Sequence, residues 1–168
     1  LRAVARVPRH LFVPESVRHR AYEDSALPIG GGQTISQPWV QARSLELAKL
    51  TGRERVLEVG TGSGYQTALL SLLVDQVFSI ERLAPLAQSA RAALEAAGIR
   101  NVSIMVGDGT LGWRPYAPYD AIIVAAASPA LAVGSWRLLS GGGPPAPLLP
   151  HLAVVAASFG LACCAAWL

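Results

Sequence analysis

One short stretch, residues 56–65 (VLEVGTGSGY), constrains this chain more than any other. Val56, Leu57 and Val59 are typical of a buried strand, and a helical pattern begins directly after three alternating glycines. A strand, a tight glycine turn and a helix form the start of a βαβ nucleotide-binding unit. The glycines let a ligand approach the backbone, and the helix start offers unpaired N–H groups. An ordinary turn with packing glycines is the alternative.

The glycine spacing and the acid before it narrow the class of ligand. The pattern is G-x-G-x-G, whereas dinucleotide-binding folds carry G-x-G-x-x-G. Glu58 stands at the strand end, where a carboxylate would face a cationic or amino-bearing ligand and would repel a pyrophosphate. S-adenosylmethionine fits this requirement, because it carries a sulfonium and an amino group and has no phosphate.

The order of the expected elements predicts an α/β fold, a Rossmann-like, open, mostly parallel sheet with helices on both faces. We expect strands at 55–59, 76–80, 102–106 and 119–125, and helices at 37–50, 65–74 and 83–97. The unbroken apolar run of the fourth strand suits a parallel strand that is buried on both faces. Ligands of such sheets bind at the carboxyl ends of the strands.

Acidic residues follow two of these strands. Glu81 ends the second strand about 20 positions after the glycine loop, a place that suits hydrogen bonds to ribose hydroxyls. A carboxylate at the surface is the alternative. Asp108 lies between Gly107 and Gly109 after the third strand. It could accept a hydrogen bond from an adenine amino group, or it could simply form a turn.

A second informative stretch is 26–38, ALPIGGGQTISQP. Its three consecutive glycines are expected to deny it regular structure. Thr34 and Ser36 then present hydroxyls, and Ser36 is placed to cap the helix that follows, with Leu47 among its core contacts and Gly52 as its stop. The stretch is interpreted either as a flexible loop with a serine cap or as a substrate-side wall that contacts a bound carboxylate.

Composition limits the partners and the compartment. The net charge is +3, and the basic residues are scattered, which indicates a solvated surface and no nucleic-acid partner. Cys163 and Cys164 are adjacent, and no metal-binding spacing of Cys and His occurs, so no metal site is expected. The N-terminus has no signal-peptide stretch, which favours the cytoplasm. We expect a monomer without membrane association.

The end of the chain differs from the rest. Residues 138–168 contain no Asp, Glu, Lys or Arg, and the last run approaches the length of a membrane span without flanking charges. We interpret this segment as a divergent tail, from a truncated or frame-shifted coding sequence, after a domain at 1–137. The sheet is therefore expected to be incomplete at its C-terminal edge. Because the chain begins with Leu1, a fragment or trimmed form is expected.

Several motifs together resemble one enzyme family. ALPIGGGQTISQP, VLEVGTGSGYQTALL, SIE, VGDG with GW shortly after, and YDAIIVAAA are similar in order and spacing to protein-L-isoaspartate O-methyltransferases. These are class I S-adenosylmethionine-dependent enzymes. The resemblance covers roughly residues 7–129. TISQP is its most discriminating motif, since many methyltransferases share the glycine loop.

The resemblance implies methyl transfer from S-adenosylmethionine to the α-carboxylate of L-isoaspartyl residues in damaged proteins and peptides, which begins their repair. It makes Ser36 the active-site serine. The residues that it assigns to the cofactor are Gln33, Thr34, Ile35, Glu58, Gly60, Thr61, Gly62, Ser63, Gly64, Glu81, Arg82, Asp108 and Gly109.

The reaction so implied needs no general base, because a carboxylate is already ionised at neutral pH. Ser36 is therefore expected to orient the substrate and not to act as a nucleophile. Two other functions stay open. One is a catalytically impaired fragment that keeps the cofactor-binding fold, and the other is a methyltransferase with another acceptor. A nicotinamide dehydrogenase fits least well, because the glycine spacing differs.

Overall fold

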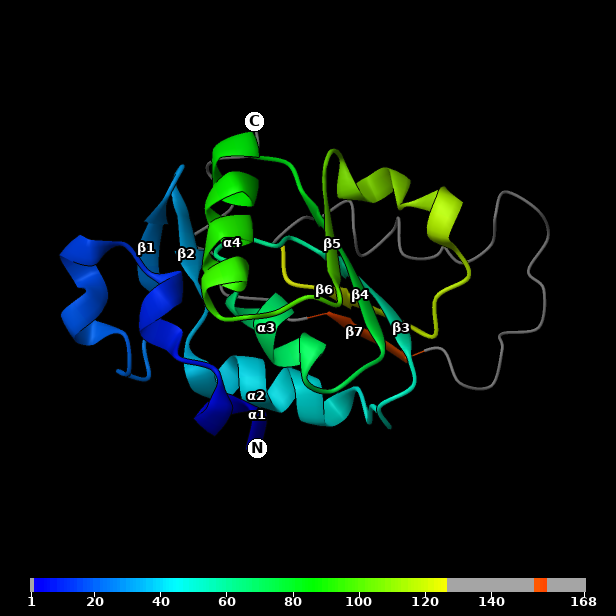
Figure 1. Cartoon of the computed structure of the whole chain (residues 1–168), viewed down its shortest axis with the longest axis horizontal. Helices are drawn as coiled ribbons and strands as arrows, with labels where there is room; N and C mark the ends of the chain where they lie inside the picture. The colour runs from blue at the N-terminus through cyan, green and yellow to red at the C-terminus, as the bar shows by residue number, and fades with distance from the viewer. Residues whose placement is uncertain (1, 127–152, 157–168) are drawn as a thin grey trace.

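The computed structural model describes residues 2–126 and 153–156 (Figure 1). Its α-helices are α1 (Arg2–Arg6), α2 (Pro38–Leu47), α3 (Tyr65–Ser71) and α4 (Ala84–Ala96). Its 3₁₀ helices are η1 (Arg9–Phe12), η2 (Glu15–Arg20), η3 (Gly109–Leu111) and η4 (Arg114–Tyr116). Its strands are β1 (Leu27–Gly30), β2 (Gln33–Ile35), β3 (Arg55–Val59), β4 (Gln76–Glu81), β5 (Val102–Val106), β6 (Ala121–Val124) and β7 (Ala153–Ala156).

The main sheet has the strand order β5-β4-β3-β6-β7, and its neighbouring strands are parallel. In the centre, Val56 of β3 lies opposite Val77 of β4 on one side and Ala121 of β6 on the other. This arrangement confirms the predicted α/β fold with a parallel sheet. The carboxyl ends of β3, β4 and β6 consequently meet at one edge.

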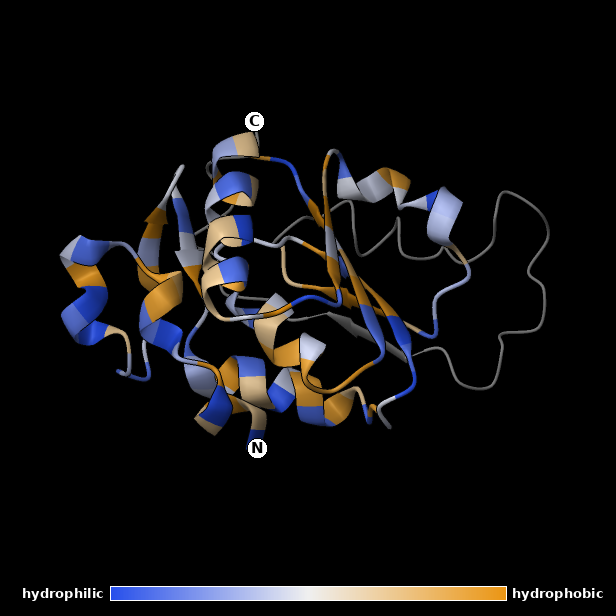
Figure 2. Ribbon diagram, in the orientation of Figure 1, coloured by the Kyte–Doolittle hydropathy of each residue, from blue (hydrophilic) through white to orange (hydrophobic). Residues whose placement is uncertain are grey.

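Side chains of β3 alternate between two apolar clusters, because successive residues of a strand point to opposite faces. Val56 lies in the larger cluster, which includes residues of α2, α3, α4 and the N-terminal segment. Leu57 and Val59 lie in a smaller cluster, in which Phe78 of β4 packs against Trp113 beside η4. Figure 2 shows the apolar residues concentrated along the central strands.

The segment that precedes β3 differs from the sequence-based expectation in two ways. The stretch 26–38 forms an antiparallel hairpin of β1 and β2, so the prediction that its glycines exclude regular structure was wrong. Gly30, Gly31 and Gly32 have positive φ angles, and Gly31 and Gly32 form the turn. Helix α2 ends at Leu47, which is 54% exposed, so its predicted core contact was also wrong.

Strand β7 lies within the charge-free segment and pairs with β6 through four residue pairs. The predicted domain boundary at residue 137 and the residues Cys163 and Cys164 lie outside the described residues. Within 2–126 and 153–156, none of the helices combines the length and the hydropathy that a membrane crossing requires.

Candidate functional site

The loop of residues 60–64 connects β3 to α3 at the carboxyl edge of the sheet. Gly60, Gly62 and Gly64 have φ angles of +95°, +55° and +84°, which residues with a side chain rarely adopt. Gly60 donates its N–H to the Ile80 carbonyl of β4 at 2.8 Å. A Cβ atom at Gly60 would lie 3.0 Å from both Cβ and N of Ala126, so a side chain there has no room.

Glu81 bridges this glycine loop to the segment after β4. Its Oε2 accepts a hydrogen bond from the Gly62 N–H at 2.8 Å, and its Oε1 accepts one from the Leu83 N–H at 2.9 Å. Glu81 is 7% exposed. Each oxygen retains a second lone pair, so the bridge leaves acceptor capacity for a ligand at the same place.

Two hydroxyls of the loop are used within the protein. Thr61 is buried, and its Oγ1 lies 2.5 Å from Oγ of Ser79 on β4. Ser63 Oγ accepts a hydrogen bond from the Tyr65 N–H at 3.3 Å, at the first turn of α3. Both therefore support the shape of the loop. The part of the loop that can face a ligand is therefore the backbone around Gly62.

Glu58 does not occupy the ligand-facing position that the sequence predicts. It is fully buried between the sheet and α3, because it points to the same face as Val56. Its Oε2 accepts hydrogen bonds from Thr67 Oγ1 at 2.5 Å and Ser79 Oγ at 2.6 Å. Its Oε1 has no hydrogen-bond partner among the described residues. Burial raises the pKa of Glu58 to about 7, which outweighs the opposing effects of Ser79, Thr67 and the nearby Gln66 amide.

Asp108 and Gly109 begin η3 after strand β5. Asp108 Oδ1 accepts hydrogen bonds from Thr110 N at 2.9 Å and Thr110 Oγ1 at 2.8 Å. These bonds, helped by the positive charge of the exposed Arg82, hold the pKa of Asp108 below its ordinary value. The turn interpretation accounts for these contacts. A Cβ atom at Gly109 would run into Cγ1 of Val59, so a glycine is needed where η3 crosses the end of β3.

The hairpin β1–β2 lies beside the glycine loop. A Cβ atom at Gly62 would be 3.5 Å from Ile29 Cδ1, and one at Gly31 would be 3.0 Å from Leu83 Cδ1. The stretches 26–38 and 56–65 are therefore neighbours in space, although they lie about 30 residues apart in the sequence.

The predicted site residues of β2 differ in their exposure. Ile35 is 2% exposed and belongs to the core, so only its backbone could meet a ligand. Gln33 is half-buried and Thr34 is exposed. Ser36 is half-buried, but it does not cap α2 as predicted. Gln37 occupies the N-cap position without a side-chain bond.

Asp24 serves the helix start instead, because its Oδ1 accepts the Trp39 N–H at 2.9 Å. Proline at the first position of α2 removes one of the donors that a serine cap would have satisfied. Ser36 is thereby left without the local structural role that the sequence suggested.

Sequence reasoning missed Arg9, whose side chain is 1% exposed. Its Nη2 donates to the Ser36 carbonyl at 2.7 Å, and its Nη1 donates to Gln41 Oε1 at 2.9 Å. The guanidinium lies 4.7 Å from the centre of the Tyr65 ring. No local pattern distinguishes Arg9 from the other arginines of the chain, so the sequence held no signal for it.

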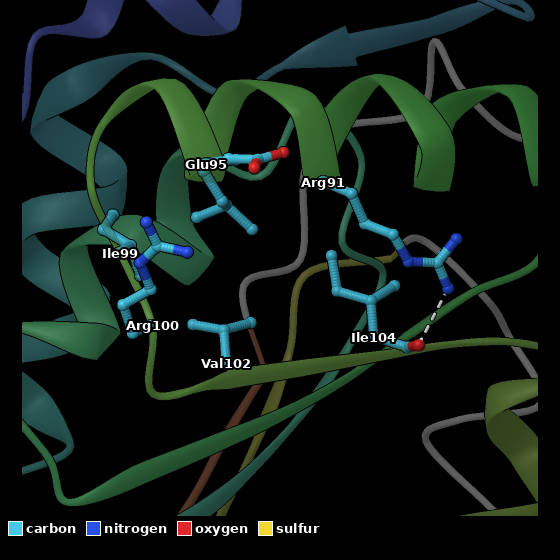
Figure 3. A pocket seen from close by; sticks show the side chains of 7 residues that line it. Arg91, Glu95, Ile99, Arg100, Val102 and Ile104 are labelled. Carbon is cyan, nitrogen blue, oxygen red and sulfur yellow. Dashed lines mark hydrogen bonds between the residues drawn. The ribbon is translucent and has the colours of Figure 1, made fainter.

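A separate groove lies between α4 and β5 (Figure 3). It is lined by Arg91, Leu94, Glu95, Ile99, Arg100, Val102 and Ile104. Arg91 Nη2 donates to the Ile104 carbonyl at 2.8 Å across it. None of the predicted site residues lines this groove, so the candidate site remains at the carboxyl edge of the sheet.

Comparisons with known proteins agree on one family. A family model described as protein-L-isoaspartate(D-aspartate) O-methyltransferase matches residues 1–144. A protein-L-isoaspartate O-methyltransferase of Syntrophus aciditrophicus is 54% identical over 143 residues, which cover 85% of this chain and 66% of the relative. One of Myxococcus xanthus is 56% identical over 143 residues, with coverage of 85% and 68%.

A solved structure of a protein-L-isoaspartate O-methyltransferase is 33% identical, with a TM-score of 0.67, and the match covers 74% of this chain and 43% of that chain. The first relatives are covered over 66%, 59% and 60% of their own length, so this chain spans less than two thirds of them. The family model and the relatives confirm the resemblance that the motifs predict. The chain belongs to the protein-L-isoaspartate(D-aspartate) O-methyltransferase family.

Proposed function

We propose that this chain transfers a methyl group from S-adenosylmethionine to the α-carboxylate of L-isoaspartyl residues in damaged proteins and peptides. Family membership supports this activity. The observation that carries it is the packing of hairpin β1–β2, which leads to Ser36, beside the glycine loop, which would hold the methyl donor. The acceptor and the donor would then meet at the carboxyl edge of the sheet.

The residues at this edge fit the proposed cofactor. The glycine loop leaves room for close backbone contact, and Glu81 retains acceptor capacity for ribose hydroxyls. Glu58 supports the loop from within the core, because Ser79 donates to its Oε2 and also contacts Thr61 of the loop. When bound, S-adenosylmethionine supplies a methyl group already activated by its sulfonium.

The chain's own residues have little proton chemistry to perform. The substrate carboxylate has an ordinary pKa near 4, so it is ionised at neutral pH and needs no base. We assign to Ser36 a hydrogen bond that orients this carboxylate. The remaining contribution is in-line positioning and exclusion of water, which can supply several kcal/mol. The methyl ester then cyclises to a succinimide without the enzyme.

The other assignments follow from this function. The proposed cofactor residues are those of 33–35 and 60–64 with Glu81, Arg82, Asp108 and Gly109, and Glu58 supports them from the core. We propose a monomer that acts in the cytoplasm on isoaspartyl-containing proteins and peptides.

Methyl transfer from labelled S-adenosylmethionine to an isoaspartyl peptide tests the proposal, with the matching aspartyl peptide as the control. We expect label on the isoaspartyl peptide alone. Label on the aspartyl peptide as well would indicate another acceptor. A folded protein that binds S-adenosylhomocysteine but labels neither peptide would contradict the proposed activity, and would favour a chain that retains only the cofactor-binding fold.

A further inference from the structure

Arg9 is a buried cation that forms no ion pair with any described residue. It is 1% exposed, and the salt bridges among the described residues join other arginines to Glu15, Glu23 and Glu46. Burial lowers the pKa of Arg9, with smaller opposing effects from Tyr65 and Asp24. The guanidinium still stays protonated at neutral pH. A buried charge without a counter-ion is costly, so a role beyond filling space is expected.

The contacts of Arg9 join three segments that meet at the candidate site. One nitrogen donates to the Ser36 carbonyl at 2.7 Å, and another donates to Gln41 of α2 at 2.9 Å. The guanidinium plane covers the ring of Tyr65, which follows Gly64 directly in the chain. A planar group with two donors fixes the orientation of both acceptors more firmly than a single contact would.

We propose that Arg9 is a positioning residue for the methyl transfer. It holds the backbone of Ser36 at a fixed place relative to the glycine loop, so that the acceptor carboxylate lies in line with the methyl donor. This inference rests on the proposed function. The positive charge beside the Ser36 backbone also favours an anionic acceptor over a neutral one.

Arg55 provides a matched control within the same chain. Its Nη2 donates to the Tyr116 carbonyl at 2.6 Å, and its guanidinium lies 5.3 Å from the centre of the Phe78 ring. These contacts are of the same kind as those of Arg9, although Arg55 is only half-buried. Arg55 begins β3, whereas the glycine loop follows the other end of this strand. A merely structural contribution of a stacked arginine should therefore appear in both residues, and a contribution to acceptor placement should appear in Arg9 alone.

The experiment compares the whole chain with its Arg9→Gln, Arg9→Lys and Arg55→Gln variants. Three quantities are measured: kcat and KM for an isoaspartyl peptide, the Kd of S-adenosylhomocysteine, and the carbonyl carbon-13 chemical shift of Ser36. We expect Arg9→Gln to raise KM roughly tenfold, the loss of one hydrogen bond to a charged donor, and to move the Ser36 signal. Arg9→Lys should restore part of both. Arg55→Gln should change neither, and the Kd should stay within about twofold throughout.

An unchanged KM and an unmoved Ser36 signal in folded Arg9→Gln would overturn the inference, as would equal changes in Arg55→Gln. If Arg9→Gln does not fold, Arg9→Lys decides the question, because it keeps the charge and loses the planar fork. A wild-type chain that methylates no peptide refutes the proposed function. The Ser36 signal then still reports whether Arg9 fixes this backbone.

Discussion

Polar groups at the two ends of strand β3 differ in how completely they are hydrogen-bonded. At the amino end, Glu54 accepts hydrogen bonds from Thr51 N, Thr51 Oγ1, Gly52 N and Arg53 N. The Arg55 N–H is bound by Asp120 Oδ2 at 2.8 Å, which ties β3 to the start of β6. Both carboxylates accept hydrogen bonds from nearby backbone N–H groups, and these bonds help to hold the strands together at this end.

At the carboxyl end, polar atoms stay without partners. Among the described residues, the buried side-chain atoms that lack a hydrogen bond are Arg9 Nε, Glu58 Oε1 and Gln66 Nε2. Gln66 belongs to the first turn of α3, directly after the glycine loop. Unpaired buried polar groups reduce stability, so the polar groups at this end are satisfied less completely than those at the amino end.

The two glutamates show the difference most directly, since they lie four positions apart in the sequence. Burial tends to raise the pKa of Glu54, but the hydrogen bonds from Thr51 and Gly52 outweigh it and lower that pKa to about 2. Burial raises the pKa of Glu58 to about 7, because Ser79, Thr67 and the nearby Gln66 amide do not compensate for the loss of solvent. The balance between hydrogen bonds and burial therefore gives two nearby glutamates pKa values on opposite sides of the ordinary value.

Glycine substitutions at the two ends of β3 should produce the largest difference in stability and ligand affinity. Gly60→Ala combines a positive φ with a contact to Ala126, and we expect it to destabilise the fold by about 3 kcal/mol. The Kd of S-adenosylhomocysteine should rise at least about a hundredfold, because the loop must move. Gly52→Ala is the matched control. Its φ is +105°, and a Cβ atom there would meet nothing within 4 Å.

Gly52→Ala should cost about 1–2 kcal/mol from backbone strain and leave ligand affinity unchanged. Urea unfolding and calorimetric titration measure the two quantities. A comparable loss of affinity in both variants would show that the glycine loop has no special relation to the ligand.

Glu58→Gln should change how stability depends on pH. The ordinary pKa of a glutamate is 4.5, and that of folded Glu58 is about 7. The folded state therefore binds the proton more tightly, and stability falls as pH rises from 4.5 to 7. The loss is about 3 kcal/mol. Glutamine resembles the protonated acid, so the variant should lack this fall and should be the more stable protein at pH 8.

The free energy of unfolding, measured in urea between pH 4.5 and 8, gives the result. A wild-type curve that is flat in this window would mean that Glu58 is ionised in the folded protein. In that case the donors around it are sufficient, and the contrast with Glu54 disappears.

Ser36→Ala should reduce turnover without changing cofactor affinity. We expect a fall in kcat/KM of roughly 10²-fold, because the substrate is no longer oriented. The Kd of S-adenosylhomocysteine should stay the same, since the glycine loop is untouched. Ser89→Ala, a change at an exposed serine of α4, is the control and should alter neither value. An equal loss of turnover and cofactor affinity would remove Ser36 from its proposed role.

Glu54→Ala should have the smallest effect and the opposite dependence on pH. A carboxylate with a lowered pKa stabilises the fold above pH 4.5, and this contribution is lost as pH falls toward 2. Because Glu54 is only half-buried, we expect a cost of about 1 kcal/mol at pH 7. Thermal unfolding at pH 7 and pH 3 should show a difference between variant and wild type that shrinks in acid. A difference that grows in acid would contradict the sign.

The sequence predicted the central fold well, because it depends on local patterns. The strands at 55–59 and 102–106 have the bounds that their apolar runs indicate. The glycine loop could be predicted because positive φ angles restrict the residue type. Glu81 was placed correctly at the end of β4, because the apolar run of this strand stops there.

Other features depend on contacts across the fold, and no local pattern encodes them. Glu58 follows a leucine and precedes a valine, but only the packing of α3 over β3 shows that its carboxylate is enclosed. Arg9 is bound to Ser36, 27 positions along the chain. The prediction that Ser36 caps α2 was wrong, because Asp24, which is distant in the sequence, accepts a hydrogen bond at the start of this helix.

The Glu81 bridge has a consequence for the entropy of binding. Both carboxylate oxygens already hold backbone N–H groups of the glycine loop and of the segment after β4. A ligand therefore meets a loop that is rigid beforehand, and association orders the ligand more than the protein. Calorimetry across temperature should then give a heat-capacity change that matches burial of the ligand surface alone. A loop that folds on binding would bury its own apolar surface as well and would make this change more negative.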